Sequence, residues 1–207
     1  MSQLCAYRPL GLSVVSRVTH NLSMRRLLFS LCLSFVLFFG TPAVADQNDP
    51  RLDTLFDLLR ESEEPLEIQA TERLIWSIWM QHRNAEYSRM MQAGSVAMAS
   101  GQYDQAIGIF SSLIQKEPDF AEAWNKRATV YFLIGDLTLS AEDVDRTLEL
   151  EPRHFGALSG LGQIELLRGN GDAALEAFEA ARAVHPQLPG IAALIRKLEV
   201  EVRGRKL

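Results

Sequence analysis

Acidic residues and cysteines are distributed unevenly along this 207-residue chain. The first 45 residues contain no aspartate or glutamate, and both cysteines, Cys5 and Cys32, lie among them. The rest of the chain can therefore form neither a disulfide nor a thiolate metal site. This part of the chain is therefore compatible with an oxidising compartment.

Recognisable catalytic and cofactor motifs are also missing. After residue 45 the chain has three histidines: His82, His154 and His185. They form neither H-E-x-x-H nor another spacing that puts two metal ligands on one helix face. There is no G-x-S-x-G element and no phosphate-binding loop. The glycine-rich stretches 160–162 and 169–171 fit helix packing and a turn instead. We therefore expect a non-enzyme with no catalytic residue, metal site or cofactor.

Positive charge is scarce outside the leading segment. After Ala45 the chain has 17 basic and 26 acidic residues, a net charge of −9. Phosphate binding requires a basic patch, so we do not expect nucleic acid as a ligand. The longest apolar stretch, residues 27–40, is shorter than the roughly 20 residues that a membrane-spanning helix needs.

Residues 1–45 have the pattern of a leader. Arg25 and Arg26 precede the apolar stretch, and Thr41-Pro42-Ala43-Val44-Ala45 places small residues where a signal peptidase cleaves. We expect a signal peptide with its core at residues 24–45 and cleavage after Ala45, and Met24 offers an alternative start. The mature protein is then periplasmic or secreted. Two alternatives remain: an uncleaved anchor in the inner membrane, or an organellar transit peptide.

The second half of the chain carries a 34-residue repeat. Pro118, Pro152 and Pro186 are 34 residues apart, and a set of glycines keeps the same step: Gly101, Gly135 and Gly169. This period is typical of helix–turn–helix units stacked into a solenoid. It divides the chain into units at residues 87–120, 121–154 and 155–188.

Equivalent positions of the three units carry residues of similar size. Small residues at positions 8 and 20 let two helices approach, and a larger residue at position 24 fills the space beside them. These sets are Gly94, Ala128 and Gly162; Ala106, Ser140 and Ala174; and Phe110, Val144 and Phe178. The repeated glycines suit the turn between the helices. Asp104, Thr138 and Asp172 follow them, and we expect these to cap the second helices.

These residues resemble the tetratricopeptide repeat family, whose pattern is W-x2-L-G-x2-Y, A-x3-F and P. Trp124 and Tyr131 match its aromatic positions in unit two, and Ala106-x3-Phe110 and Ala174-x3-Phe178 match units one and three. Two residues depart from the pattern: Arg127 stands where Leu is usual, and Glu165 stands where Tyr is usual. The resemblance implies an all-α solenoid of three repeats. Its first helices are expected at 88–99, 121–133 and 155–167, and its second helices at 103–116, 137–150 and 171–184.

The flanks lie outside the repeat register. Residues 46–86 predict a helix pair, at 50–62 and from 65 to about 81, which we interpret as a degenerate repeat or a cap. Trp76 and Trp79 in the second helix fit packing better than a binding platform. Residues 189–207 predict a capping helix followed by a basic tail.

The resemblance also implies a binding site, because in this family the first helices line a concave groove. The candidate protein-binding residues are Met91, Ser95, Met98, Glu122, Asn125, Thr129, Ser159 and Gln163. Chaperone-binding members clamp a carboxylate with Lys, Asn and Arg at positions that here hold Met91, Ser95, Lys126, Gly156 and Gly160. A free carboxylate tail is therefore not the expected ligand.

From these features we expect a scaffold or adaptor of the cell envelope that binds a helix or an extended segment of another protein. A periplasmic chaperone-like assembly factor and a self-associating structural protein are the alternatives. We expect the protein to contact a membrane only if the leader remains uncleaved and anchors it there.

Overall fold

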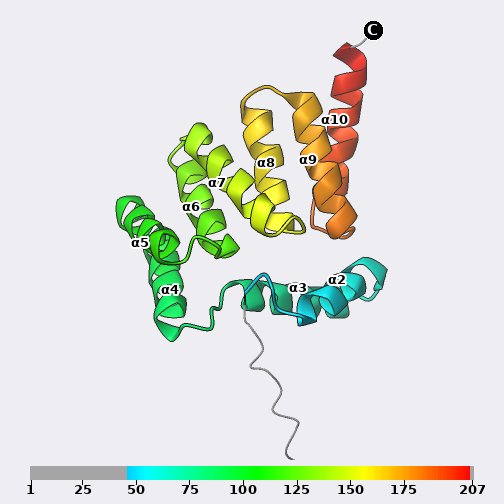
Figure 1. Cartoon of the computed structure of the whole chain (residues 1–207). Helices are drawn as coiled ribbons and strands as arrows, with labels where there is room; N and C mark the ends of the chain where they lie inside the picture. The colour runs from blue at the N-terminus through cyan, green and yellow to red at the C-terminus, as the bar shows by residue number, and fades with distance from the viewer. Residues whose placement is uncertain (1–45, 206–207) are drawn as a thin grey trace, which may run out of the picture. The chain divides into compact units, whose positions relative to one another are not determined.

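The computed structural model describes residues 46–205, and all regular structure in that range is helical (Figure 1). The helices are α2 (Arg51–Glu61), α3 (Pro65–Trp79), α4 (Ala85–Ala99), α5 (Tyr103–Lys116), α6 (Ala121–Leu133), α7 (Leu137–Leu150), α8 (Phe155–Leu167), α9 (Gly171–Val184) and α10 (Ile191–Arg205). The predicted all-α solenoid is confirmed. The predicted leader, with its cleavage after Ala45, lies outside the described residues.

The three repeats are the pairs α4–α5, α6–α7 and α8–α9, and their bounds follow the 34-residue step. From α5 to α9, each helix begins and ends at the predicted residues. Only α4 starts three residues earlier than expected, because Asn84 caps it by accepting a hydrogen bond from the Glu86 backbone N–H (2.9 Å). The turn glycines Gly101, Gly135 and Gly169 have φ of 73°, 83° and 78°, which is the left-handed conformation predicted for them.

The packing within each repeat follows the predicted size pattern. A Cβ added to Gly94 would lie 2.5 Å from Phe110 Cε1, and a Cβ on Gly162 would lie 2.5 Å from Phe178 Cε1. Both phenylalanines are fully buried. The position-8 glycines therefore exist because the aromatic ring at position 24 lies directly against the helix backbone.

The predicted capping by Asp104, Thr138 and Asp172 is wrong. Each of these residues lies one position inside its helix, because the N-cap comes directly after the turn glycine, at Gln102, Asp136 and Asn170. Among these, Asp136 accepts a hydrogen bond from the Leu139 backbone N–H (3.0 Å). Asp104 and Asp172 instead place acidic groups in the first turn, near the positive end of the helix.

The N-terminal pair α2–α3 does not continue the stack as a degenerate repeat. Its core, which includes Phe56 and Trp79, contains Phe155 from the start of α8, and Val184 and Leu188 pack against it. The pair therefore covers the loop end of the third repeat.

The outer side of the first repeat keeps an open hollow of about 480 Å³, lined by residues of α4 and α5 that include Met90, Ala93, Gly108 and Ile109.

At the other end, α10 packs on α9 as the predicted capping helix. Ile191, Ile195 and Leu198 share a core cluster with Ala174 and Phe178. In the part of the chain from 46 to 205, no helix has both the length and the apolar character needed to cross a membrane.

Candidate protein-binding face

The first helices of the three repeats present a row of accessible side chains. Helix α6 lies between α4 and α8 and contacts both. Towards the C-terminal ends of these helices, exposed or half-exposed residues come from all three repeats; we call them the A-helix face: Ser95, Met98, Thr129, Phe132, Leu133, Gln163, Leu166 and Leu167. Leu133 and Leu167 are 51% and 64% exposed, which is high for leucine. All eight side chains are uncharged.

A pocket of about 170 Å³ opens between α6 and α8. Ser140 and Val144, which lie on α7, also line this pocket between α6 and α8. The other lining residues are mostly small or apolar: Asn125, Ala128, Thr129, Phe132, Gly156, Ala157, Gly160, Gln163 and Ile164. The lining contains no charged side chain.

Three of the predicted binding residues meet at this pocket. Asn125, Thr129 and Gln163 all line it. The Thr129 hydroxyl donates to the Asn125 carbonyl (2.8 Å), and Asn125 Nδ2 donates to Glu122 Oε2 (3.0 Å). Of the other predicted residues, Ser95, Met98 and Ser159 are half-exposed on α4 and α8.

Met91 and Glu122 were predicted to contact a partner, but both side chains are buried in this structure. Met91 is 0% exposed and packs in a core cluster with Phe110 and Phe120. Glu122 is 1% exposed. Their repeat positions are those of a groove, but position alone does not show what covers a side chain.

Glu122 belongs to a buried polar cluster with Lys126 and His154. Lys126 Nζ lies 3.1 Å from Glu122 Oε1, and His154 Nε2 lies 2.8 Å from Glu122 Oε2. His154 Nδ1 accepts a hydrogen bond from the Ala157 backbone N–H (3.0 Å), so a neutral ring carries its proton on Nε2 and donates it to Glu122. Burial raises the pKa of Glu122, but Lys126 and His154 outweigh it and the net shift is downward. The carboxylate is therefore ionised and paired.

Helix α3 covers this cluster through its two tryptophans. The Trp79 indole stacks on the His154 ring, and Lys126 Nζ lies 5.3 Å from the ring centroid of Trp76. A Cβ added to Gly156 would lie 2.7 Å from Trp76 Cη2. In chaperone-binding members of the repeat family, the carboxylate clamp has a basic residue at the position of Gly156. In this chain the side chain of Trp76 fills that space. The spacing of the repeats carries no signal for this contact.

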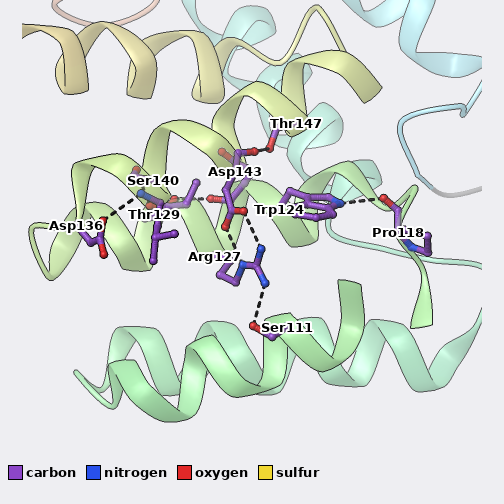
Figure 2. A network of polar contacts seen from close by, with 12 residues as sticks. Ser111, Pro118, Trp124, Arg127, Thr129, Asp136, Ser140, Asp143 and Thr147 are labelled. Atoms are coloured by element: carbon purple, nitrogen blue, oxygen red, sulfur yellow. Dashed lines mark hydrogen bonds and ion pairs between the residues drawn. The ribbon is translucent and has the colours of Figure 1, made fainter. Parts of the chain in front are cut away.

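Arg127, which departs from the family pattern, is part of a polar network between repeats (Figure 2). Its Nε and Nη2 each donate to an Asp143 carboxylate oxygen at 2.8 Å, and its Nη1 donates to Ser111 Oγ (3.0 Å). The guanidinium also lies 5.1 Å from the Trp124 ring centroid. The hydrogen bonds to Asp143 raise the pKa of Arg127. This network joins α5, α6 and α7 and is structural.

No group of three or more metal-ligating side chains occurs among residues 46–205.

Comparison with known proteins agrees with this architecture. The model of the tetratricopeptide repeat family matches residues 91–150 and 134–189. A TPR repeat-containing protein of Rhizobium etli is 34% identical over 136 residues, covering 66% of this chain and 67% of that protein. DnaJ homolog subfamily C member 3 of Gallus gallus is 28% identical over 103 residues, which are 50% of this chain and 20% of that much longer protein.

Solved structures share the fold at low sequence identity. The TPR domain of Sgt2 from Aspergillus fumigatus has a TM-score of 0.55 at 20% identity, covering 59% of this chain and 83% of that one. The type III secretion chaperone SycD of Yersinia enterocolitica, in complex with a peptide of the translocator YopD, has a TM-score of 0.54 at 10% identity, with 57% and 95% covered. The first TPR of Spaghetti (RPAP3), bound to an HSP90 peptide, has a TM-score of 0.54 at 18% identity, with 56% and 93% covered.

Proposed function

Because the chain belongs to the tetratricopeptide repeat family, we propose that it is a non-catalytic scaffold that binds a segment of another protein along its A-helix face. The observation that carries this proposal is the row of accessible, uncharged side chains on three successive first helices. Exposed leucines such as Leu133 and Leu167 lie in this row beside Thr129 and Gln163. Apolar patches with a polar rim are typical of protein-interaction sites.

Two of the structural relatives support this class of ligand. SycD was solved with a translocator peptide and the RPAP3 domain with an HSP90 peptide, so this fold can hold a peptide segment. The basic clamp positions differ here, since Gly156 and Gly160 replace charged residues. The proposed ligand is therefore an internal segment of a partner, either helical or extended, and not a free C-terminal carboxylate.

The proposed compartment is the cell envelope. Arg25 and Arg26, the apolar stretch and the small residues before Asp46 support export, and a chain without cysteine after residue 45 suits an oxidising compartment. N-terminal sequencing of the mature protein tests this. A first residue at Asp46 agrees with the proposal, and any other first residue contradicts cleavage after Ala45.

The binding proposal is tested by charge substitutions on the A-helix face. Thr129 is exposed on α6 and lines the pocket, so Thr129→Arg introduces a charge there with little effect on the core. The matched control is Glu142→Arg, at an exposed position of α7. After cross-linking in an envelope extract, we expect Thr129→Arg to lose at least one partner that the control retains. Identical partners for both variants, with circular dichroism showing both folded, contradict the proposal.

Self-association is a second candidate, favoured by the open hollow on the first repeat. Ala93 and Gly108 are small, exposed residues in that hollow, beside the half-buried Met90 and Ile109. Light scattering over a range of concentrations tests this candidate: a mass that rises with concentration and stays monomeric in Ala93→Arg supports self-association, and a monomer throughout contradicts it.

A further inference from the structure

We infer that the pocket between α6 and α8 accepts one uncharged apolar side chain, of the size of leucine or phenylalanine, from the bound segment. This inference rests on the proposed function and specifies its ligand. A cavity of about 150 Å³ lined by apolar side chains can hold a benzene ring. The pocket here has about 170 Å³, so it has room for one such group and not for two.

Gly160 forms part of the pocket wall, and its missing side chain leaves that part of the wall open. A Cβ added to Gly160 meets no atom within 4 Å, whereas the helical glycines Gly94, Gly156 and Gly162 each lie against an aromatic ring. Glycine inside a helix is unfavourable relative to alanine, so helix formation does not favour it at this position. The consequence of glycine at 160 is an open pocket wall where a partner can approach the helix backbone closely.

The chemistry of the lining selects against charged ligands. No Lys, Arg, Asp or Glu side chain lines the pocket, so a charged group would lose hydration without gaining an ion pair. Ala128, Ala157 and Ile164 provide apolar contacts. At the polar side, Thr129 and Gln163 are exposed and can hydrogen-bond to the backbone on either side of an anchored residue.

The test uses N-acetyl-4-fluorophenylalanine amide and N-acetylleucine amide as probes, with the alanine and aspartate analogues as controls. Binding to the full chain is followed by ¹⁹F line width and by the backbone amide shifts of Gly156, Gly160 and Gln163. We expect the fluorophenylalanine and leucine probes to shift these amides. The alanine analogue, which buries less apolar area, should bind roughly 10- to 100-fold more weakly.

Gly160→Leu fills the pocket and should abolish these shifts, with Gly160→Ala giving a partial loss. The matched control is Gly204→Leu, because Gly204 is also helical and its Cβ would likewise meet no atom within 4 Å, but it lies on α10. Shifts that persist in Gly160→Leu overturn the inference, as do equal shifts from the aspartate analogue or no shifts at all.

The outcome separates this inference from the proposed function. If Thr129→Arg loses a cross-linked partner while Gly160→Leu keeps it with wild-type affinity, the A-helix face binds its partner but the pocket takes no anchor. If neither substitution affects any partner, the proposed function fails as well.

Discussion

The imidazole of His154 lies flat against the indole of Trp79, with ring centroids 4.1 Å apart and an interplanar angle of 11°. This contact joins the N-terminal helix pair to the start of the third repeat, since Trp79 ends α3 and His154 caps α8. The same contact covers the buried Glu122 carboxylate, which is paired with Nε2 of the His154 ring. The helix pair is thus docked on the third repeat through this contact, although it does not continue the stack.

Trp79→Ala should destabilise the protein by about 3 to 5 kcal/mol, the cost of truncating a buried aromatic side chain. Trp79 is 1% exposed and contacts Phe56, Phe155 and His154. Leu66→Ala is the control in the same helix, because Leu66 is 80% exposed. Urea unfolding measures both free energies, and an equal loss in the two variants would contradict the docking of α3.

Stability should fall as the pH is lowered from 7 towards 5. Burial lowers the pKa of His185 below its ordinary value of 6.5, against the opposing effect of Glu72, whose Oε2 lies 3.6 Å from Nε2. Burial likewise lowers the pKa of His82, against Glu117 and Asp46. The unfolded chain then binds more protons than the folded one below about pH 6.5, so the stability present above that pH is lost on acidification.

His185→Leu should reduce this pH dependence, since it removes one of the two histidines whose pKa is lowered by burial. Each such histidine contributes a slope of at most about 1.4 kcal/mol per pH unit. The measurement is the free energy of unfolding at several pH values in wild type and variant. Parallel curves would show that His185 does not titrate in this range.

Two glycines in α8 should respond to alanine in opposite directions. Gly162→Ala should destabilise by about 1 to 3 kcal/mol, because its Cβ would lie 2.5 Å from Phe178 Cε1 and the ring must move. Gly160→Ala meets no atom within 4 Å and should stabilise by up to about 1 kcal/mol through helix propensity. Thermal unfolding compares the two variants, and stability changes of the same sign would contradict the close packing of Phe178 against Gly162.

Removing one partner of the Arg127–Asp143 pair should cost more than removing both. Asp143 is 4% exposed, so Asp143→Ala leaves the Arg127 guanidinium partly buried without its carboxylate, at a cost of up to about 3 kcal/mol. The double variant Arg127→Leu, Asp143→Ala restores the leucine typical of this repeat position and should recover part of that loss. Additive losses in a double-mutant cycle would contradict coupling between the two side chains.

The sequence predicts the repeats well because each position is determined locally. The 34-residue step places helix ends and turn glycines, and steric fit between Gly162 and Phe178 or Gly94 and Phe110 explains the small and large positions. Helix capping was predicted less well: Thr138 was expected to cap α7, but the N-cap is Asp136, which accepts a hydrogen bond from the Leu139 backbone N–H.

The candidate site was predicted only in part, because burial depends on contacts between distant segments. Trp76 and Gly156 are 80 residues apart in the sequence, and no periodicity links them. Repeat position selected Asn125, Thr129 and Gln163, which all line one pocket, although Asn125 is itself buried. It could not show that Glu122 is covered, and it gave no reason to single out Gly160 as part of a pocket wall.

Site-specific photo-cross-linking is the sharpest test of partner binding at the A-helix face, because it reports which surface touches the partner in the native complex. A benzophenone side chain at Gln163, exposed on α8 beside the pocket, is compared with one at Glu142, exposed on α7. We expect Gln163 to cross-link a discrete partner in the envelope, and we expect no such cross-link from Glu142. Cross-links from Glu142 alone would contradict binding at the A-helix face.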